Sequence, residues 1–126
     1  MIVIGDSYIP HETITVVDKI EDIKFTNANT TVVFKFCKNM MKYCMVNDVS
    51  YGVMITSIKE SIYANNLNAK YILPSNRTLE PIQKIAENYM FDSKILATIH
   101  SEDEIEKIAL KSIDGVILDT ILENKI

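Results

Sequence analysis

The chain has 126 residues, a hydrophobic fraction of 48 % and only three glycines and three prolines. This length and composition are typical of one globular domain over residues 1–126 and exclude a disordered chain. The net charge of −4 comes from 13 basic and 17 acidic residues without a basic cluster, which argues against nucleic-acid binding.

The amino-terminal third has the weakest pattern. Residues 2–4 read as a strand that ends at Gly5, and residues 13–17 read as a second short strand. Asp18 and Glu21 match a capping box that opens a short helix to about Phe25. Residues 26–30 are polar and read as a loop.

From residue 31 onward, short β-branched runs alternate with stretches of helical period. The predicted strands cover residues 31–36, 51–56, 70–73, 94–99 and 115–118. Most of them are almost entirely apolar, which is typical of strands that are covered on both faces. In the first of these strands, Lys35 favours an edge position, where a charge blocks further pairing. A lysine with a depressed pKa that forms a Schiff base is the alternative.

Four helices are predicted between these strands, over residues 38–47, from Ser57, over residues 78–90 and from Ser101. Capping boxes at Ser57 with Glu60 and at Ser101 with Glu104 mark the second and fourth starts. The period of the second helix predicts that Ile58, Ile62 and Leu67 are buried. In the third helix it predicts a buried face of Leu79, Ile82, Ala86 and Tyr89, with Gln83 on the opposite side.

Strands joined through helices must run parallel, with right-handed crossovers. We therefore predict an α/β fold, a three-layer sandwich of the Rossmann-like or flavodoxin-like kind. Its mostly parallel sheet would have about five or six strands, with short helices on both faces. A closed eight-stranded barrel usually needs about 250 residues, which disfavours that alternative.

Two segments resemble parts of known families. Residues 2–8 resemble the opening block of GDSL-type hydrolases, which implies that Ser7 is a nucleophile. The Asp-x-x-His block of that family has no match here, since Ala97 stands three residues before His100. Residues 52–74 resemble the fourth-to-fifth-strand region of response-regulator receiver domains, with Thr56 at the Thr position. Leu73 replaces the lysine of that family, and the strand before offers no phosphoacceptor aspartate.

Ligands of open parallel sheets bind beyond the carboxyl ends of the strands. Arg77, just before a helix, suits a small anionic ligand, and His100 could transfer protons. The candidate ligand-binding residues at this rim are Ser75, Asn76, Arg77, His100, Ser101 and Asp119.

No cofactor or metal is predicted. The glycines form no phosphate-binding loop, and the histidines and cysteines lack the close ligand pairs of a zinc site.

No apolar run reaches the roughly 18 residues of a membrane span, and the first residues do not form a signal peptide. Cys37 and Cys44 do not form a disulfide framework. We therefore expect a cytoplasmic protein that does not bind membranes.

No catalytic set is complete. The favoured function is accordingly a non-catalytic binding or regulatory module that acts through protein contacts, with itself as a homodimer or with another protein. The alternative is a small enzyme or an anionic-ligand-binding protein that uses the rim near Arg77 and His100.

Overall fold

The computed structural model describes residues 1–123 and places seven strands in one parallel sheet. The strands are β1 (Ile2–Ile4), β2 (Thr13–Val16), β3 (Thr30–Lys35), β4 (Tyr51–Ile55), β5 (Tyr71–Pro74), β6 (Lys94–Ile99) and β7 (Gly115–Leu118). The helices are α1 (Ile20–Lys24), α2 (Lys38–Val46), α3 (Ile58–Asn66), α4 (Leu79–Asn88) and α5 (Ile105–Leu110), with the 3₁₀ helices η1 (Glu102–Glu104) and η2 (Asp119–Leu122).

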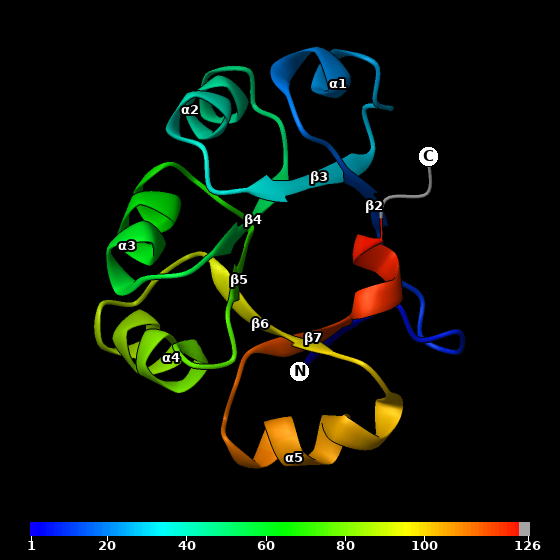
Figure 1. Cartoon of the computed structure of the whole chain (residues 1–126), viewed down its shortest axis with the longest axis vertical. Helices are drawn as coiled ribbons and strands as arrows, with labels where there is room; N and C mark the ends of the chain where they lie inside the picture. The colour runs from blue at the N-terminus through cyan, green and yellow to red at the C-terminus, as the bar shows by residue number, and fades with distance from the viewer. Residues whose placement is uncertain (124–126) are drawn as a thin grey trace.

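The strand order is β1-β7-β6-β5-β4-β3-β2, so from β2 onward each strand pairs with the next one in the chain. Right-handed crossovers that always step in one direction place their helices on one face of the sheet. Figure 1 shows α1 to α5 around the outside of a curled sheet, with η2 on the inner side. The curl brings η2 into contact with both β7 and β2, although these strands are far apart in the sheet.

The predicted α/β fold with a parallel sheet is confirmed, and the sheet has seven strands rather than five or six. The count is higher because both short amino-terminal strands join it, β1 beside β7 and β2 beside β3. The two faces are covered unequally. Five α-helices cover the outer face, and η2 covers part of the inner face.

The strands are buried on both faces because each face has its own core. The outer core contains side chains from all five α-helices, among them Ile23, Met41, Ala64, Ile82 and Ile108. The smaller inner core is formed by Ile4, Val33, Tyr71, Leu73, Leu96 and Ile117, with Ile121 and Leu122 of η2 packed against them. Because side chains alternate along each strand, successive residues point into the outer core and the inner core in turn.

Strand β3 is not an edge strand, so that prediction was wrong. It pairs with β2 on one side and with β4 on the other. Lys35 is nevertheless exposed, because it is the last residue of β3 and lies at the carboxyl end of the sheet. A charge at the end of a strand reaches solvent without an edge position.

Helix α3 starts where its cap predicts but buries another face. The Ser57 hydroxyl accepts a hydrogen bond from the Glu60 amide at 3.2 Å. Ile58 and Ile62 are 40 % and 45 % exposed, whereas Ser61 and Ala64 are buried. Small side chains let the helix lie close to β4 and β5, which leaves the larger ones at its flanks.

In α4, Leu79, Ile82 and Ala86 are buried as predicted. The predictions for Tyr89 and Gln83 were wrong. Tyr89 is 75 % exposed because the helix ends before it. Gln83 is buried, and its side-chain oxygen accepts a hydrogen bond from the Asp114 amide at 2.9 Å. A buried amide is tolerated because it is hydrogen-bonded.

At the amino-terminal start of α1, the Asp18 and Glu21 capping box does not form. The Lys19 backbone occupies the cap position, and the Asp18 amide donates to the Asp22 carboxylate at 3.2 Å. The acceptor is therefore four residues from the amide rather than three.

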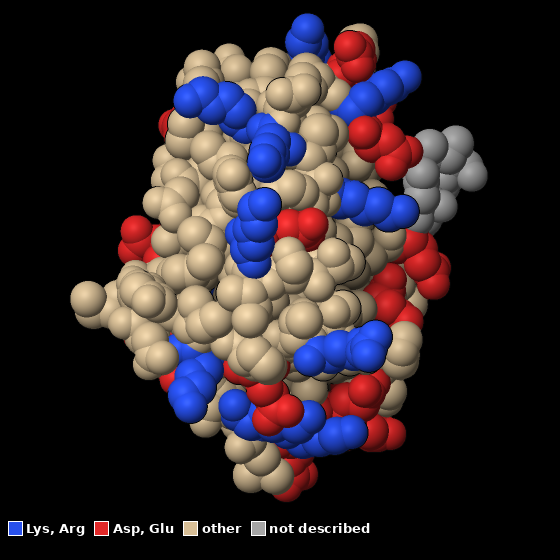
Figure 2. Space-filling view, turned by 60° about the vertical axis from the view of Figure 1, so that its left-hand side comes forward, with Lys and Arg blue, Asp and Glu red and all other residues tan. Residues whose placement is uncertain are grey.

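The surface carries dispersed charges. On the face turned toward the viewer in Figure 2, lysine and arginine side chains are spread from top to bottom rather than gathered in one patch. Within residues 1–123 no helix is long and apolar enough to cross a membrane.

Glu12 anchors the segment that leads into β2. Its carboxylate accepts hydrogen bonds from the hydroxyls of Thr31 and Tyr71 and from the Lys70 ammonium, the last at 2.8 Å. These three donors belong to or adjoin the middle strands, at the amino end of the sheet. Burial raises the pKa of Glu12, but the three donors outweigh burial and hold the pKa below its usual value.

Acid should weaken this anchor. A carboxylate with a lowered folded pKa contributes stability that is present above its unfolded pKa and is lost as pH falls through the folded value. We expect Glu12→Gln to lower the free energy of unfolding by about 1–3 kcal/mol at neutral pH. The variant should also lose stability less steeply than the wild type below about pH 5. Urea denaturation over a pH series measures both effects. Glu106→Gln, an exposed change on α5, is the control, and an equal acid response in all three proteins would contradict the expectation.

Gly115 sets the close approach of β1 to β7. A Cβ atom at this position would lie 2.6 Å from the Ile2 carbonyl oxygen and 2.8 Å from Leu96 Cδ2. The backbone contact cannot move without disturbing the β1–β7 pair.

Gly115→Ala should therefore cost about 1–3 kcal/mol of the free energy of unfolding. Gly52→Ala is the graded control, because its nearest contact would be 3.2 Å, to Tyr71 Cβ. Chemical denaturation of the two variants should show the larger loss at Gly115. Equal denaturation midpoints for Gly115→Ala and the wild type would show that β1 can shift without cost.

Candidate functional site

The structure brings together part of the predicted rim. His100 follows β6 and Asp119 follows the neighbouring β7, so both lie at the carboxyl end of the sheet. The His100 Nδ1 lies 2.5 Å from an Asp119 carboxylate oxygen. The His100 side chain is 77 % exposed. The hydrogen bond and the charge of Asp119 raise the pKa of His100 above its ordinary value.

The polar groups beside this pair build the next helical turn. The Ser101 hydroxyl accepts a hydrogen bond from the Asp103 amide at 3.2 Å. The Glu104 carboxylate accepts from the amides of His100 and Ser101, at 2.7 and 3.2 Å. The predicted capping box is thus confirmed. The Ser101 hydroxyl and the Glu104 carboxylate are therefore already bonded to backbone N–H groups at the start of this helical turn, which have no partner within the helix.

The second part of the predicted rim forms a separate turn. The hydroxyls of Ser75 and Thr78 lie 3.1 Å apart between β5 and α4. Asn76 and Arg77 are exposed at the tip of this turn. Among residues 1–123, no hydrogen bond or ion pair joins this turn to His100.

The residues that carry the two family resemblances have local roles. The Asp6 carboxylate accepts a hydrogen bond from the Tyr8 amide at 2.8 Å, and Ser7 is exposed in that turn. The Thr56 amide donates to the Glu60 carboxylate at 2.9 Å, which completes the start of α3. These contacts explain the Gly-Asp-Ser string and the strand-ending threonine as turn and cap residues.

The thiols and carboxylates do not gather into a metal centre in the part of the chain that the structure describes. Cys44 is on the buried side of α2, and burial raises the pKa of its thiol to about 11. The thiol therefore stays protonated at neutral pH.

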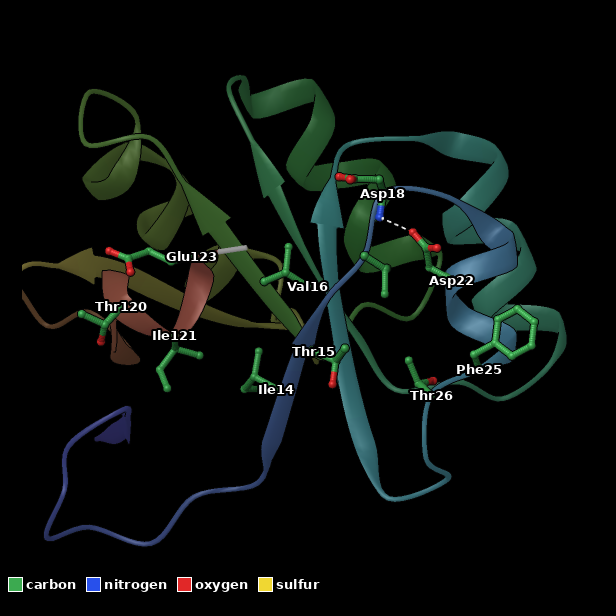
Figure 3. A pocket seen from close by; sticks show the side chains of 11 residues that line it. Ile14, Thr15, Val16, Asp18, Asp22, Phe25, Thr26, Thr120, Ile121 and Glu123 are labelled. Atoms are coloured by element: carbon green, nitrogen blue, oxygen red, sulfur yellow. Dashed lines mark hydrogen bonds between the residues drawn. The ribbon is translucent and has the colours of Figure 1, made fainter. Parts of the chain in front are cut away.

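A separate hollow lies along the open edge of the sheet. This β2-edge groove has a volume of about 560 Å³. It is lined by Ile14, Thr15, Val16, Val17, Asp18, Asp22, Phe25, Thr26, Thr120, Ile121 and Glu123. Figure 3 shows β2 running through it, with the α1 residues on one side and the η2 residues on the other.

The edge of β2 offers unpaired backbone groups to this groove. Among residues 1–123, strand β2 pairs only with β3, in parallel register. The Val17 amide donates to the Val33 carbonyl, so Val17 and, by alternation, Thr15 turn their backbone groups toward β3. Ile14 and Val16 therefore turn their N–H and C=O groups outward, to the open side.

The walls of the groove combine apolar and acidic side chains. Ile14 packs at the inner core with Ile121 of η2, and Phe25 on the other side is 88 % exposed. Asp18, Asp22 and Glu123 line the groove, and among residues 1–123 no lysine, arginine or histidine does. An exposed phenylalanine beside an open strand edge is typical of a contact surface rather than of a catalytic pocket.

Little in the sequence indicates this groove. Residues 13–17 were predicted as a short strand, but any position in the sheet would fit that prediction. The edge position of β2 follows from pairing with β3 alone, and the far wall comes from η2, more than a hundred residues later. The six rim residues predicted from the sequence do not line this groove.

Comparisons with known proteins add no assignment: no protein-family model matches the chain, and no curated protein matches it.

The His100 and Asp119 contact has a direct spectroscopic test. Because Asp119 holds the proton on His100, the imidazole should titrate above about pH 6.5. Asp119→Asn should lower that pKa. Proton and nitrogen NMR of the two histidine rings measures the effect, with His11 as the internal control because it precedes β2 and contacts the Glu12 carbonyl rather than Asp119. An unchanged His100 titration in the variant would contradict the contact in solution.

Proposed function

We propose that the chain is a non-catalytic module that acts through protein contacts and docks another polypeptide strand at the β2-edge groove. The observation that carries the proposal is the open edge of β2, whose outward N–H and C=O groups face a groove of about 560 Å³. An extended segment that adds to such an edge gains main-chain hydrogen bonds, and the flanking walls select its side chains.

The length of the edge fits this use. Four residues of β2 span about 13 Å, enough for a short added strand. Natural proteins usually protect a free edge with charge, proline or a covering segment. Here Ile14 and Val16 present no charge and no proline, and α1 and η2 stand beside the edge as walls.

The alternative function, a small enzyme or an anionic-ligand site at the rim, has weaker support. Ser101 and Glu104 are engaged in capping, and the turn that holds Arg77 shares no hydrogen bond with His100 among the described residues. A histidine and a carboxylate without a third group and a cleft do not make a catalytic set.

We further propose a cytoplasmic location. Both cysteines are free thiols, and they lie in or beside the core rather than in a disulfide. Free cysteines of this kind fit a reducing compartment. The partner in the proposal is a protein, either a second copy of the chain or another polypeptide, without nucleic acid or membrane.

The docking edge can be tested with a displayed library of random peptides. Clones that are enriched on the wild-type protein are then tested on an edge-blocked double variant, Ile14→Pro with Val16→Pro. These prolines remove the outward N–H groups of residues 14 and 16 and spare the inward N–H groups that pair with β3. They also shorten two apolar side chains of the groove. Enriched peptides should bind the wild type and bind the edge-blocked variant at least about tenfold more weakly.

Leu110→Ser is the matched control for general stickiness, because Leu110 is an exposed apolar residue outside the groove. It should bind the clones like the wild type. Circular dichroism confirms that all variants keep their fold. If no clone is enriched, or if the clones bind the edge-blocked variant equally well, the docking proposal is wrong.

A further inference from the structure

We infer that the β2-edge groove selects an extended segment of a different protein, one that carries lysine or arginine beside alternating apolar residues. The inference rests on the proposed function and adds the chemistry of the partner to it. It is drawn from the charges that line the groove and from their position along β2.

All three ionisable side chains that line the groove are carboxylates. Asp18 is the second residue after β2, Asp22 lies on α1, and Glu123 directly follows η2. Two segments from opposite ends of the chain therefore bring their carboxylates to one hollow. In the described part of the chain, lysine, arginine and histidine are absent from its lining. Complementary charge attracts a cationic segment and rejects an acidic one.

The carboxylates and the apolar residues occupy different parts of the groove. Figure 3 shows Asp18 and Asp22 near the carboxyl end of β2, whereas Ile14 and Ile121 lie toward its start. The Asp18 amide donates to the Asp22 carboxylate at 3.2 Å, which keeps these two residues together. A fitting segment therefore places apolar side chains along Ile14 and Val16 and a basic side chain next to Asp18.

A second copy of this chain fits the groove poorly. Pairing β2 of one copy with β2 of another about a two-fold axis would bring two such grooves together. From residues 1–123, each groove contributes three carboxylates and no cation, so like charges would meet at the contact. The net charge of −4 opposes such pairing further. The groove therefore favours a basic partner over self-association.

The test uses the strongest edge-dependent peptide from the library in two forms, as selected and with each basic residue replaced by glutamine. Fluorescence anisotropy measures the affinity of both forms for the wild type. We expect the selected form to contain lysine or arginine and to bind about tenfold more tightly than its glutamine form, because each exposed charge pair adds only a small factor. Raising the salt concentration should remove most of that difference.

Asp18→Asn with Asp22→Asn should weaken the selected peptide by about the same factor and leave the glutamine form unaffected, because only the charged pair is lost. Asparagine keeps the side-chain oxygen that accepts the Asp18 amide. Glu21→Gln is the matched control, since Glu21 is exposed on α1 but does not line the groove. It should leave both affinities unchanged.

The two proposals fail in different ways. Edge-dependent peptides without basic residues, or with equal affinity in the two forms, would overturn the basic-partner inference and leave edge docking in place. Dimers detected by sedimentation velocity that the edge-blocked variant lacks would also overturn the inference, because a second copy would then occupy the groove. The absence of any edge-dependent peptide would overturn both proposals.

Discussion

The fold depends on one topological constraint, the right-handed crossover between parallel strands that are also neighbours in the sheet. Because every step from β2 to β7 goes the same way, all five α-helices are placed on one face, and the sheet curls around the other. The curl then decides what fills the inner face. A small apolar core lies there, and η2 extends across it from β7 to contact β2.

The same constraint leaves two strands at the edges, β1 and β2. Strand β1 is held tightly to β7 because Gly115 lets the backbones approach. The segment that leads from β1 into β2 is tied to the middle strands by the Glu12 carboxylate. Near the carboxyl end of β2, by contrast, α1 and η2 stand apart on either side of the strand. The groove lies where the curled sheet remains open. It combines the exposed edge of β2 with a lining of carboxylates.

The rim could be predicted in part from the positions of the strand ends, whereas the groove could not. The carboxyl ends of parallel strands lie at one edge of the sheet, so the sequence placed His100 and Asp119 at the same rim. They are in contact because β6 and β7 are neighbours in the sheet. The same argument placed Arg77 at the rim, but a shared edge does not fix the direction of an exposed side chain. The groove needed more than strand ends, because its two walls come from α1 and η2.

The sequence by itself determined the α/β class, the parallel direction of the strands and most helix starts, because alternation, period and caps are local properties. It did not determine the buried side of α3, where close approach to the sheet favoured Ser61 and Ala64 over larger residues. Only the tertiary structure decided the strand order, the inner position of β3 and the open edge of β2. These features depend on pairing between segments far apart in the chain. The sequence pattern of a strand does not distinguish an edge strand from a central one.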